Sequence, residues 1–136
     1  GERMATYGFD GEKNKLPVMP ANDTGWVKAT TSDPLITTNN IYSRLLSGVL
    51  YVVGAVAIDT GSTVGELSAN LTLAHTNSFN KMGSVEQPIA VRNNGLGTIH
   101  ETDLGVAELK GNAMKLSFSI QNAQKYIAYI NMAIPQ

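Results

Sequence analysis

Residues 49–58 (VLYVVGAVAI) constrain the fold more than any other part of the chain. Every residue in this run is apolar or Gly, Ser47-Gly48 precede it, and Asp59-Thr-Gly-Ser follow it. A short apolar run between turn residues predicts a central strand covered on both faces. A transmembrane helix is excluded, because it needs ~20 apolar residues and Arg44 lies just upstream.

The composition limits the class of protein. The chain has 136 residues, of which 43% are hydrophobic, so it can bury one core as a single domain without metals or disulfides. It contains no Cys, which excludes thiol catalysis and Cys-ligated zinc. The net charge is -1 and 15% of residues are charged, so we expect no nucleic-acid partner. We also expect no cofactor and no insertion into a membrane.

Residues 1–24 differ from the rest of the chain. Gly8, Gly11, Pro17 and Pro20 interrupt them, which predicts an extended arm or linker. Residues 1–3, before Met4, have the character of an expression-tag remnant, and the segment lacks the features of a secretory signal. We expect this arm to join the domain formed by residues 25–136 to other proteins or to a neighbouring subunit.

Period-two patterns predict strands at residues 67–73, 113–120 and 126–134, and turn signals separate further short strands within residues 25–136. Residues 30–40 are predicted to form a loop, because Asp33-Pro34 and Asn39-Asn40 are turn signals. Residues 85–93 can form a strand only if Pro88 lies at an edge or at the strand's beginning. No helical stripe of useful length is present, so the chain is predicted to be all-β, an antiparallel β-sandwich or jelly-roll-like domain. The predicted strands are residues 25–29, 49–58, 67–73, 85–93, 97–102, 106–110, 113–120 and 126–134.

The last predicted strand, residues 126–134, is apolar on both faces. Tyr126, Ala128 and Ile130 alternate with Ile127 and Tyr129. One face is expected to meet the core, and a monomer would leave Ile127 and Tyr129 in water. The simplest prediction for the other face is an interface between copies of the chain.

The central run also carries a resemblance. Its residues fit the pattern Tyr-x-Arg, a short gap, then Gly-Val-x-Tyr-x-x-Gly-Ala-Val, at Tyr42, Arg44, Gly48, Val49, Tyr51, Gly54, Ala55 and Val56. This resembles the β-sandwich domains of baseplate and receptor-binding proteins from tailed bacteriophages of Gram-positive hosts. Residues 88–91, 97–100, 111–112 and 126–135 fill the later places of that family's order, although the Trp that many members have after the hairpin turn is missing. The resemblance implies a homotrimer on the virion, at the tail tip or baseplate.

The resemblance further implies that the domain binds a saccharide of the host surface. Sugar recognition needs an aromatic plane and a few polar groups held on loops. Trp26 is the only Trp and lies beside a predicted loop, where packing in the core is the alternative. Arg44 is expected to be structural. The polar candidates at predicted strand ends are His75, Asn77, Arg92, Asn93, His100 and Asp103.

Catalytic alternatives have less support. Asp59-Thr-Gly-Ser follows Ala57-Ile58, as in aspartic proteases, where two carboxylates share a proton and a small chain would supply the second by dimerising. No hydrophobic-hydrophobic-Gly followed by a helix lies downstream, as those enzymes require, and a polar turn at a strand end has the same composition, so the sequence favours the turn. His100 and Asp103 need not converge across a strand end, so no metal site is predicted.

The sequence therefore favours a non-enzymatic domain that binds a host saccharide. One alternative is a structural adaptor that binds other tail proteins through the N-terminal region. Another is the saccharide-binding module of a larger enzyme. Several weak sugar sites held in one oligomer would gain avidity.

Overall fold

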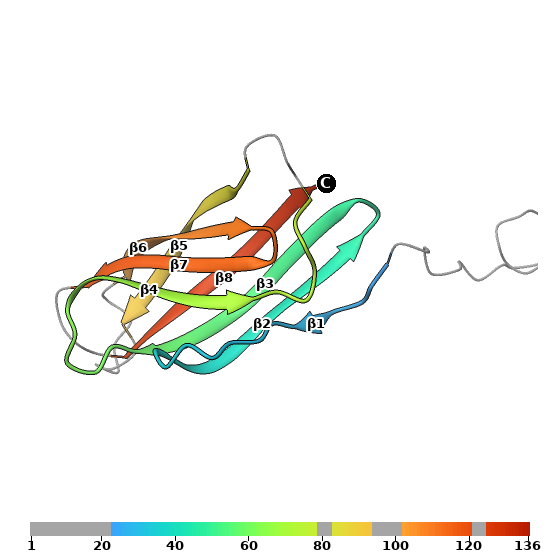
Figure 1. Ribbon diagram of the computed structural model, residues 1–136. Helices are drawn as coiled ribbons and strands as arrows, with labels where there is room; N and C mark the ends of the chain where they lie inside the picture. Colours follow the sequence, from blue (N-terminus) through green and yellow to red (C-terminus); the bar gives the residue numbers. More distant parts are fainter. Residues whose placement is uncertain (1–22, 79–82, 94–101, 121–124) are drawn as a thin grey trace, which may run out of the picture.

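The computed structural model describes residues 23–78, 83–93, 102–120 and 125–136, which form eight strands (Figure 1). The strands are β1 (Val27–Lys28), β2 (Ile36–Leu46), β3 (Val49–Asp59), β4 (Gly65–Thr72), β5 (Val85–Asn93), β6 (Thr102–Lys110), β7 (Ala113–Ile120) and β8 (Lys125–Pro135). These residues contain no helix, and hence none that could cross a membrane. The prediction of an all-β fold is confirmed.

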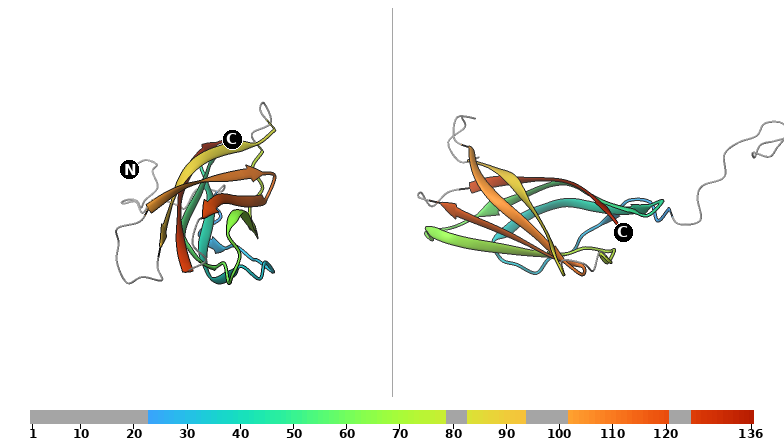
Figure 2. Two further views of the ribbon diagram at one scale, coloured as in Figure 1. Left: turned by 90° about the vertical axis from the view of Figure 1, so that its left-hand side faces the viewer. Right: turned by 90° about the horizontal axis from the view of Figure 1, so that it is seen from above.

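All eight strands belong to one antiparallel sheet in the order β1-β2-β3-β8-β5-β6-β7-β4. Three of its strand pairs are nested in the sequence, because β3 pairs with β8, β4 with β7, and β5 with β6. The sheet curls on itself, so that the half made of β4, β7 and β6 faces the half made of β2, β3 and β8 (Figures 1 and 2). The core fills the space between the two halves.

A short seam joins the two edges of the curled sheet. Thr30 and Thr72 exchange two backbone hydrogen bonds, of 2.9 and 2.8 Å. The Thr31 hydroxyl donates to the Asn70 carbonyl at 2.7 Å, and the Asn70 amide donates to an Asp33 carboxylate oxygen at 2.8 Å. These contacts bring the segment after β1 against the end of β4.

The inner side of each strand supplies the core, as the period-two patterns predict. The hairpin of β6 and β7 turns at Gly111-Asn112, and Met114, Leu116 and Phe118 are buried while Lys115 and Ser119 are exposed. On β8, buried residues alternate with exposed or half-exposed ones along the whole strand. The predictions of a hairpin at residues 106–120 and of a last strand with one face in the core are confirmed.

Only one face of β3 is buried, so the prediction of a strand covered on both faces is wrong. Leu50, Val52, Val56 and Ile58 are at most 1% exposed, whereas the residues between them are half-buried. The physical reason is the single curled layer, because no described residue packs over the outside of β3. The apolar run in the sequence therefore reflects one core face and one uncovered face.

The loop predicted for residues 30–40 is too long, because β2 begins at Ile36. Asp33-Pro34 does make a turn, in which the Asp33 carboxylate accepts a hydrogen bond from the Leu35 amide at 3.0 Å. Asn39 instead lies within β2, where its side-chain amide donates to the Ala29 carbonyl at 2.8 Å. This hydrogen bond to the residue that follows β1 gives the polar side chain a partner.

Pro88 lies at a position where its missing donor costs nothing. β5 pairs with β6 along its length, but it pairs with β8 only from Ala90 to Asn93. Pro88 is therefore beyond the part of β5 that pairs with β8, as its tolerance in a strand requires. The strand predicted for residues 97–102 falls outside the described residues, apart from Thr102, which begins β6.

Gly54 lies in the middle of β3, where the sheet bends. Its φ is 132°, and a Cβ built on it would lie 1.9 Å from the carbonyl oxygen of Asn40 on β2. A glycine inside a strand marks a close approach of another backbone, and glycine kinks let a sheet curve. Gly54 therefore allows the tight pairing of β2 and β3 in the curled sheet.

Candidate functional site

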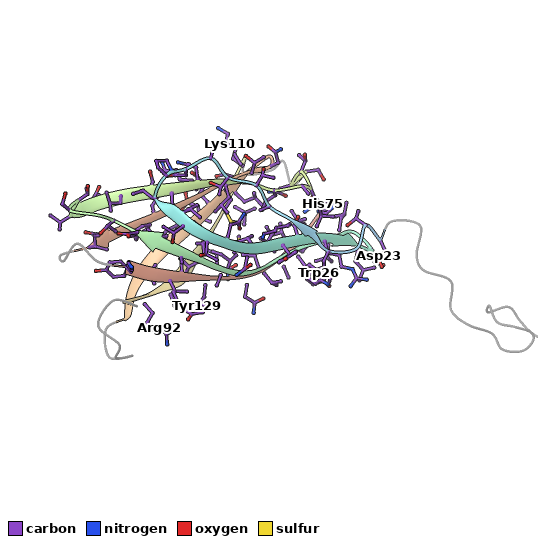
Figure 3. All side chains as sticks on the ribbon, turned by 90° about the horizontal axis from the view of Figure 1, so that it is seen from below. Asp23, Trp26, His75, Arg92, Lys110 and Tyr129 are labelled. Carbon is purple, nitrogen blue, oxygen red and sulfur yellow. The ribbon has the colours of Figure 1, made fainter. Side chains whose placement is uncertain are left out.

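The outer side of β1, β2, β3 and β8 carries a continuous group of aromatic and small apolar side chains. Residues directly opposite each other in antiparallel strands share a face, and the register places Tyr42 opposite Val53 and Ala55 opposite Tyr129. Figure 3 shows Trp26 and Tyr129 on the same side of the sheet. We call this surface the aromatic face. It consists of Trp26, Tyr42, Tyr51, Val53, Ala55, Ile127 and Tyr129.

The aromatics of this face are open to solvent. Trp26 is 47% exposed, Tyr42 36% and Tyr129 41%. The alternative that Trp26 packs in the core is therefore wrong. Trp26 directly precedes β1, which is two residues long and lies at the border of the sheet, so the indole stays outside.

An ion pair fixes the end of the face near β1. Arg44 Nε donates to Asp23 Oδ1 at 2.8 Å, and Nη2 donates to Oδ2 at 2.6 Å. The guanidinium carbon lies 5.8 Å from the centre of the Trp26 ring, within cation–π range. Arg44 is thus held by Asp23 beside an exposed indole, as the expectation of a structural, paired Arg requires.

The same pair controls the charge of Asp23. The hydrogen bonds from Arg44, and then the one from the Gly25 amide, lower the pKa of Asp23 to about 2. Asp23 is therefore charged at neutral pH, and so is its partner. Thr24 also donates its backbone amide to the Leu45 carbonyl at 3.0 Å, so residues 23 and 24, which we placed in the N-terminal arm, contact β2.

A second Arg lies near the other end of the face. The guanidinium carbon of Arg92, on β5, lies 5.9 Å from the centre of the Tyr129 ring. The register places Arg92 opposite Ile127. Its Nε is buried and has no hydrogen-bond partner among the described residues. An Arg beside an aromatic therefore stands at both ends of the aromatic face.

His75 and Asn77 lie elsewhere. His75 Nδ1 is 2.8 Å from the hydroxyl of Ser43, which is fully buried on the inner side of β2, opposite in direction to Arg44. Asn77 is 6% exposed, and its side-chain oxygen accepts a hydrogen bond from Gln136 at 3.2 Å. Both side chains hold the segment after β4 against the sheet, away from the aromatic face.

Two of the predicted saccharide residues, Trp26 and Arg92, lie on the same side of the sheet. They lie at opposite ends of the aromatic face. Asn93 ends β5 and Asp103 lies in β6, with side chains outside the description, and His100 falls outside the described residues altogether. Sequence reasoning missed Tyr42 and Tyr51 as parts of the aromatic face, and Asp23 as the partner of Arg44. The two-residue turn at Ser47-Gly48 was the available signal, because it fixes the register of β2 and β3.

Asp59 ends β3 in a polar turn. Its carboxylate accepts a hydrogen bond from the Gly61 amide at 2.9 Å, and the Thr63 amide donates to the Thr60 carbonyl at 3.0 Å. This is the hydrogen bonding of an Asx turn, the interpretation that the sequence favoured. The described residues also contain no group of three or more His, Asp or Glu that could hold a metal ion.

Comparison with protein families, with curated proteins and with solved structures finds no match to this chain.

Proposed function

We propose that this chain is a non-enzymatic receptor-binding domain of a bacteriophage tail, which binds a saccharide on the surface of a Gram-positive host. Trp26 carries the proposal, because nearly half of its surface is open beside a guanidinium that Asp23 holds in place. The residues that resemble phage baseplate domains form the hairpin of β2 and β3, which supports the same function. The domain would act on the virion, with its N-terminal region bound to other tail proteins.

The aromatic face offers what a sugar ring needs at the end near β1. A pyranose can stack on the exposed part of Trp26 or Tyr42. Arg44 uses Nε and Nη2 for Asp23, and a guanidinium has five N–H donors, so donors remain for ring hydroxyls. Lys28, opposite Tyr42, adds a further cation. These groups bind and orient a ligand and require no reaction.

The middle of the aromatic face supports an oligomer. Val53, Ala55, Ile127 and Tyr129 lie on the central strands β3 and β8, and surfaces of this kind mark contacts with other proteins. We propose a homotrimer that packs through these residues and leaves Trp26 at its rim. The nested pairing of β3 with β8, β4 with β7 and β5 with β6 supports a jelly-roll-like sandwich as the form of each subunit.

The same central residues favour a second candidate function, a structural adaptor of the baseplate. In that case the half-buried Ile127 and the exposed Tyr129 would contact another tail protein, and no saccharide would bind. The two functions differ in what Trp26 does, because only the receptor-binding function requires it.

Binding of the fluorescently labelled domain to intact Gram-positive cells tests the proposal, with released cell-wall polysaccharide as competitor. Saturable binding that the polysaccharide competes is the expected result. Trp26→Ala should abolish it, whereas Val64→Ala, at another exposed apolar residue, should bind as the unchanged protein does. Binding to no strain of a broad host panel, or full binding by Trp26→Ala, would overturn the proposal and leave the adaptor.

A further inference from the structure

A groove of about 680 Å³ lies on the outer side of the other half of the sheet, where β4, β7 and β6 run side by side (Figure 1). This volume is within the ~300–1,000 Å³ of typical ligand sites. We call it the serine groove. Its solvent-facing lining is Glu66, Ser68, Pro88, Val106, Lys115, Ser117 and Ser119.

The strand register sets the spacing of the lining groups. Ser117 on β7 lies opposite Ser68 on β4 and opposite Val106 on β6, and Ser119 lies opposite Glu66. Opposite residues are ~5 Å apart at Cβ, and every second residue along a strand is ~7 Å on. The hydroxyls therefore form a regular array rather than a single point.

The polar groups of the groove have no partners in the described part of the protein. Glu66, Ser68, Lys115, Ser117 and Ser119 make no side-chain hydrogen bond or ion pair there. Near the seam the opposite holds, because Thr31, Asp33 and Asn39 all use their side chains on the backbone. A Ser hydroxyl provides one donor and two acceptors, so the groove presents several free donors and acceptors to a ligand.

An apolar floor and two opposite charges complete the groove. Val106 is 40% exposed, and Pro88 lines the groove beside it. Glu66 and Lys115 lie about four residues apart along the β4–β7 pair, since Asn70 is opposite Lys115, a span of roughly 14 Å. The lining carries one acid and one base, so we expect it to bind a ligand that has no net charge.

We propose that the serine groove binds an oligosaccharide of at least two rings, without net charge. Val106 and Pro88 contact the C–H face of a ring, the three Ser hydroxyls exchange hydrogen bonds with ring hydroxyls, and Glu66 and Lys115 bind groups at the two ends. A protein partner fits less well, because the groove's solvent-facing lining has no aromatic anchor of the kind that dominates protein interfaces. The proposal goes beyond the proposed function, since the groove lies on the half of the sheet opposite Trp26.

The test is amide NMR of the isotopically labelled protein, titrated separately with chitotriose, maltotriose and cellotriose to millimolar concentration. At least one should shift the amides of residues 66–68, 105–106 and 115–119. The double variant Ser68→Ala/Ser117→Ala should weaken that binding by roughly tenfold, as the loss of two hydrogen bonds predicts. Ser32→Ala/Ser62→Ala, at exposed loop serines, is the matched control and should bind unchanged.

The readout separates this site from the aromatic face. Shifts confined to the Trp26 indole and its neighbours would overturn the groove and leave the receptor-binding proposal standing. Shifts confined to the groove would support the groove as the binding site and would count against saccharide binding at Trp26. Equal binding by the double variant and its control would overturn the groove even if the amides shift.

Discussion

Among the Gly→Ala substitutions at the described glycines, Gly54→Ala should destabilise the protein most. The new Cβ would lie 1.9 Å from the Asn40 carbonyl oxygen, and real Cβ contacts essentially never fall below 3.0 Å. The two strands must therefore separate by at least 1.1 Å at this point, the difference between those values. The obstacle is backbone of β2, which cannot rotate away as a side chain could.

The size of the effect follows from two costs. Separation breaks about two hydrogen bonds of the β2–β3 ladder, at ~0.5–1.5 kcal/mol each. A Cβ at a φ of 132° adds strain, roughly 1–3 kcal/mol for a backbone conformation that L side chains rarely adopt. The sum is about 2–6 kcal/mol, a large part of the ~5–15 kcal/mol that stabilises a typical domain.

Urea unfolding measures this loss, and Gly65→Ala is the matched control. Gly65 has a φ of 101°, but a Cβ there would meet nothing within 4 Å, so this variant carries the backbone strain without the collision. Gly54→Ala should unfold at a clearly lower urea concentration than Gly65→Ala, with an unchanged slope. Equal midpoints for the two variants would refute the close approach of β2 and β3 as the reason for Gly54.

Three further changes test other parts of the structure. Because the pKa of Asp23 falls from 3.8 to about 2 on pairing with Arg44, the stability from this pair is full above pH 3.8 and is lost as the pH falls towards 2. Asp23→Asn should therefore flatten the pH dependence of the urea midpoint over that window. A pH dependence equal to that of the unchanged protein would contradict the pairing. Ser47→Asn should stabilise the protein by up to ~1 kcal/mol in thermal unfolding, because Ser47 has a φ of 50°; a lower melting temperature would count against the turn. Tyr129→Lys should reduce the mass measured by light scattering from trimer to monomer, while Val64→Lys should not, and a monomeric unchanged protein would end the trimer proposal.

The period-two patterns predicted strands well where one face is buried and the other is open. The β6–β7 hairpin and β8 are of this kind, because their apolar residues alternate with polar or exposed ones. The start of β2 escaped prediction because the Asn39 side chain finds a partner in Ala29, a contact that propensity alone does not reveal. Local pattern shows which residues point inward, and long-range pairing decides what lies beside them.

The candidate site shows the same division. Asp23 holds Arg44 although the two residues are 21 positions apart in the sequence. Arg92 lies beside Tyr129 only because β5 pairs with β8. Neither neighbour can be chosen from the sequence, because any two amphipathic strands could pair. The short turn between β2 and β3 is the exception, since it fixes the register and so places Tyr42 opposite Val53.

The seam between Thr30 and Thr72 determines how much of the sheet is left open to other chains. Unpaired strand edges are templates for aggregation and domain swapping. β1 offers an edge of two residues, and the seam occupies β4 from Asn70 onward, so in the described residues the free edge of β4 is confined to Gly65–Ala69, where Glu66 places a charge. A change such as Asp33→Ala removes the carboxylate that holds Asn70 and would lengthen that edge. We expect such a variant to form fibres before it loses binding.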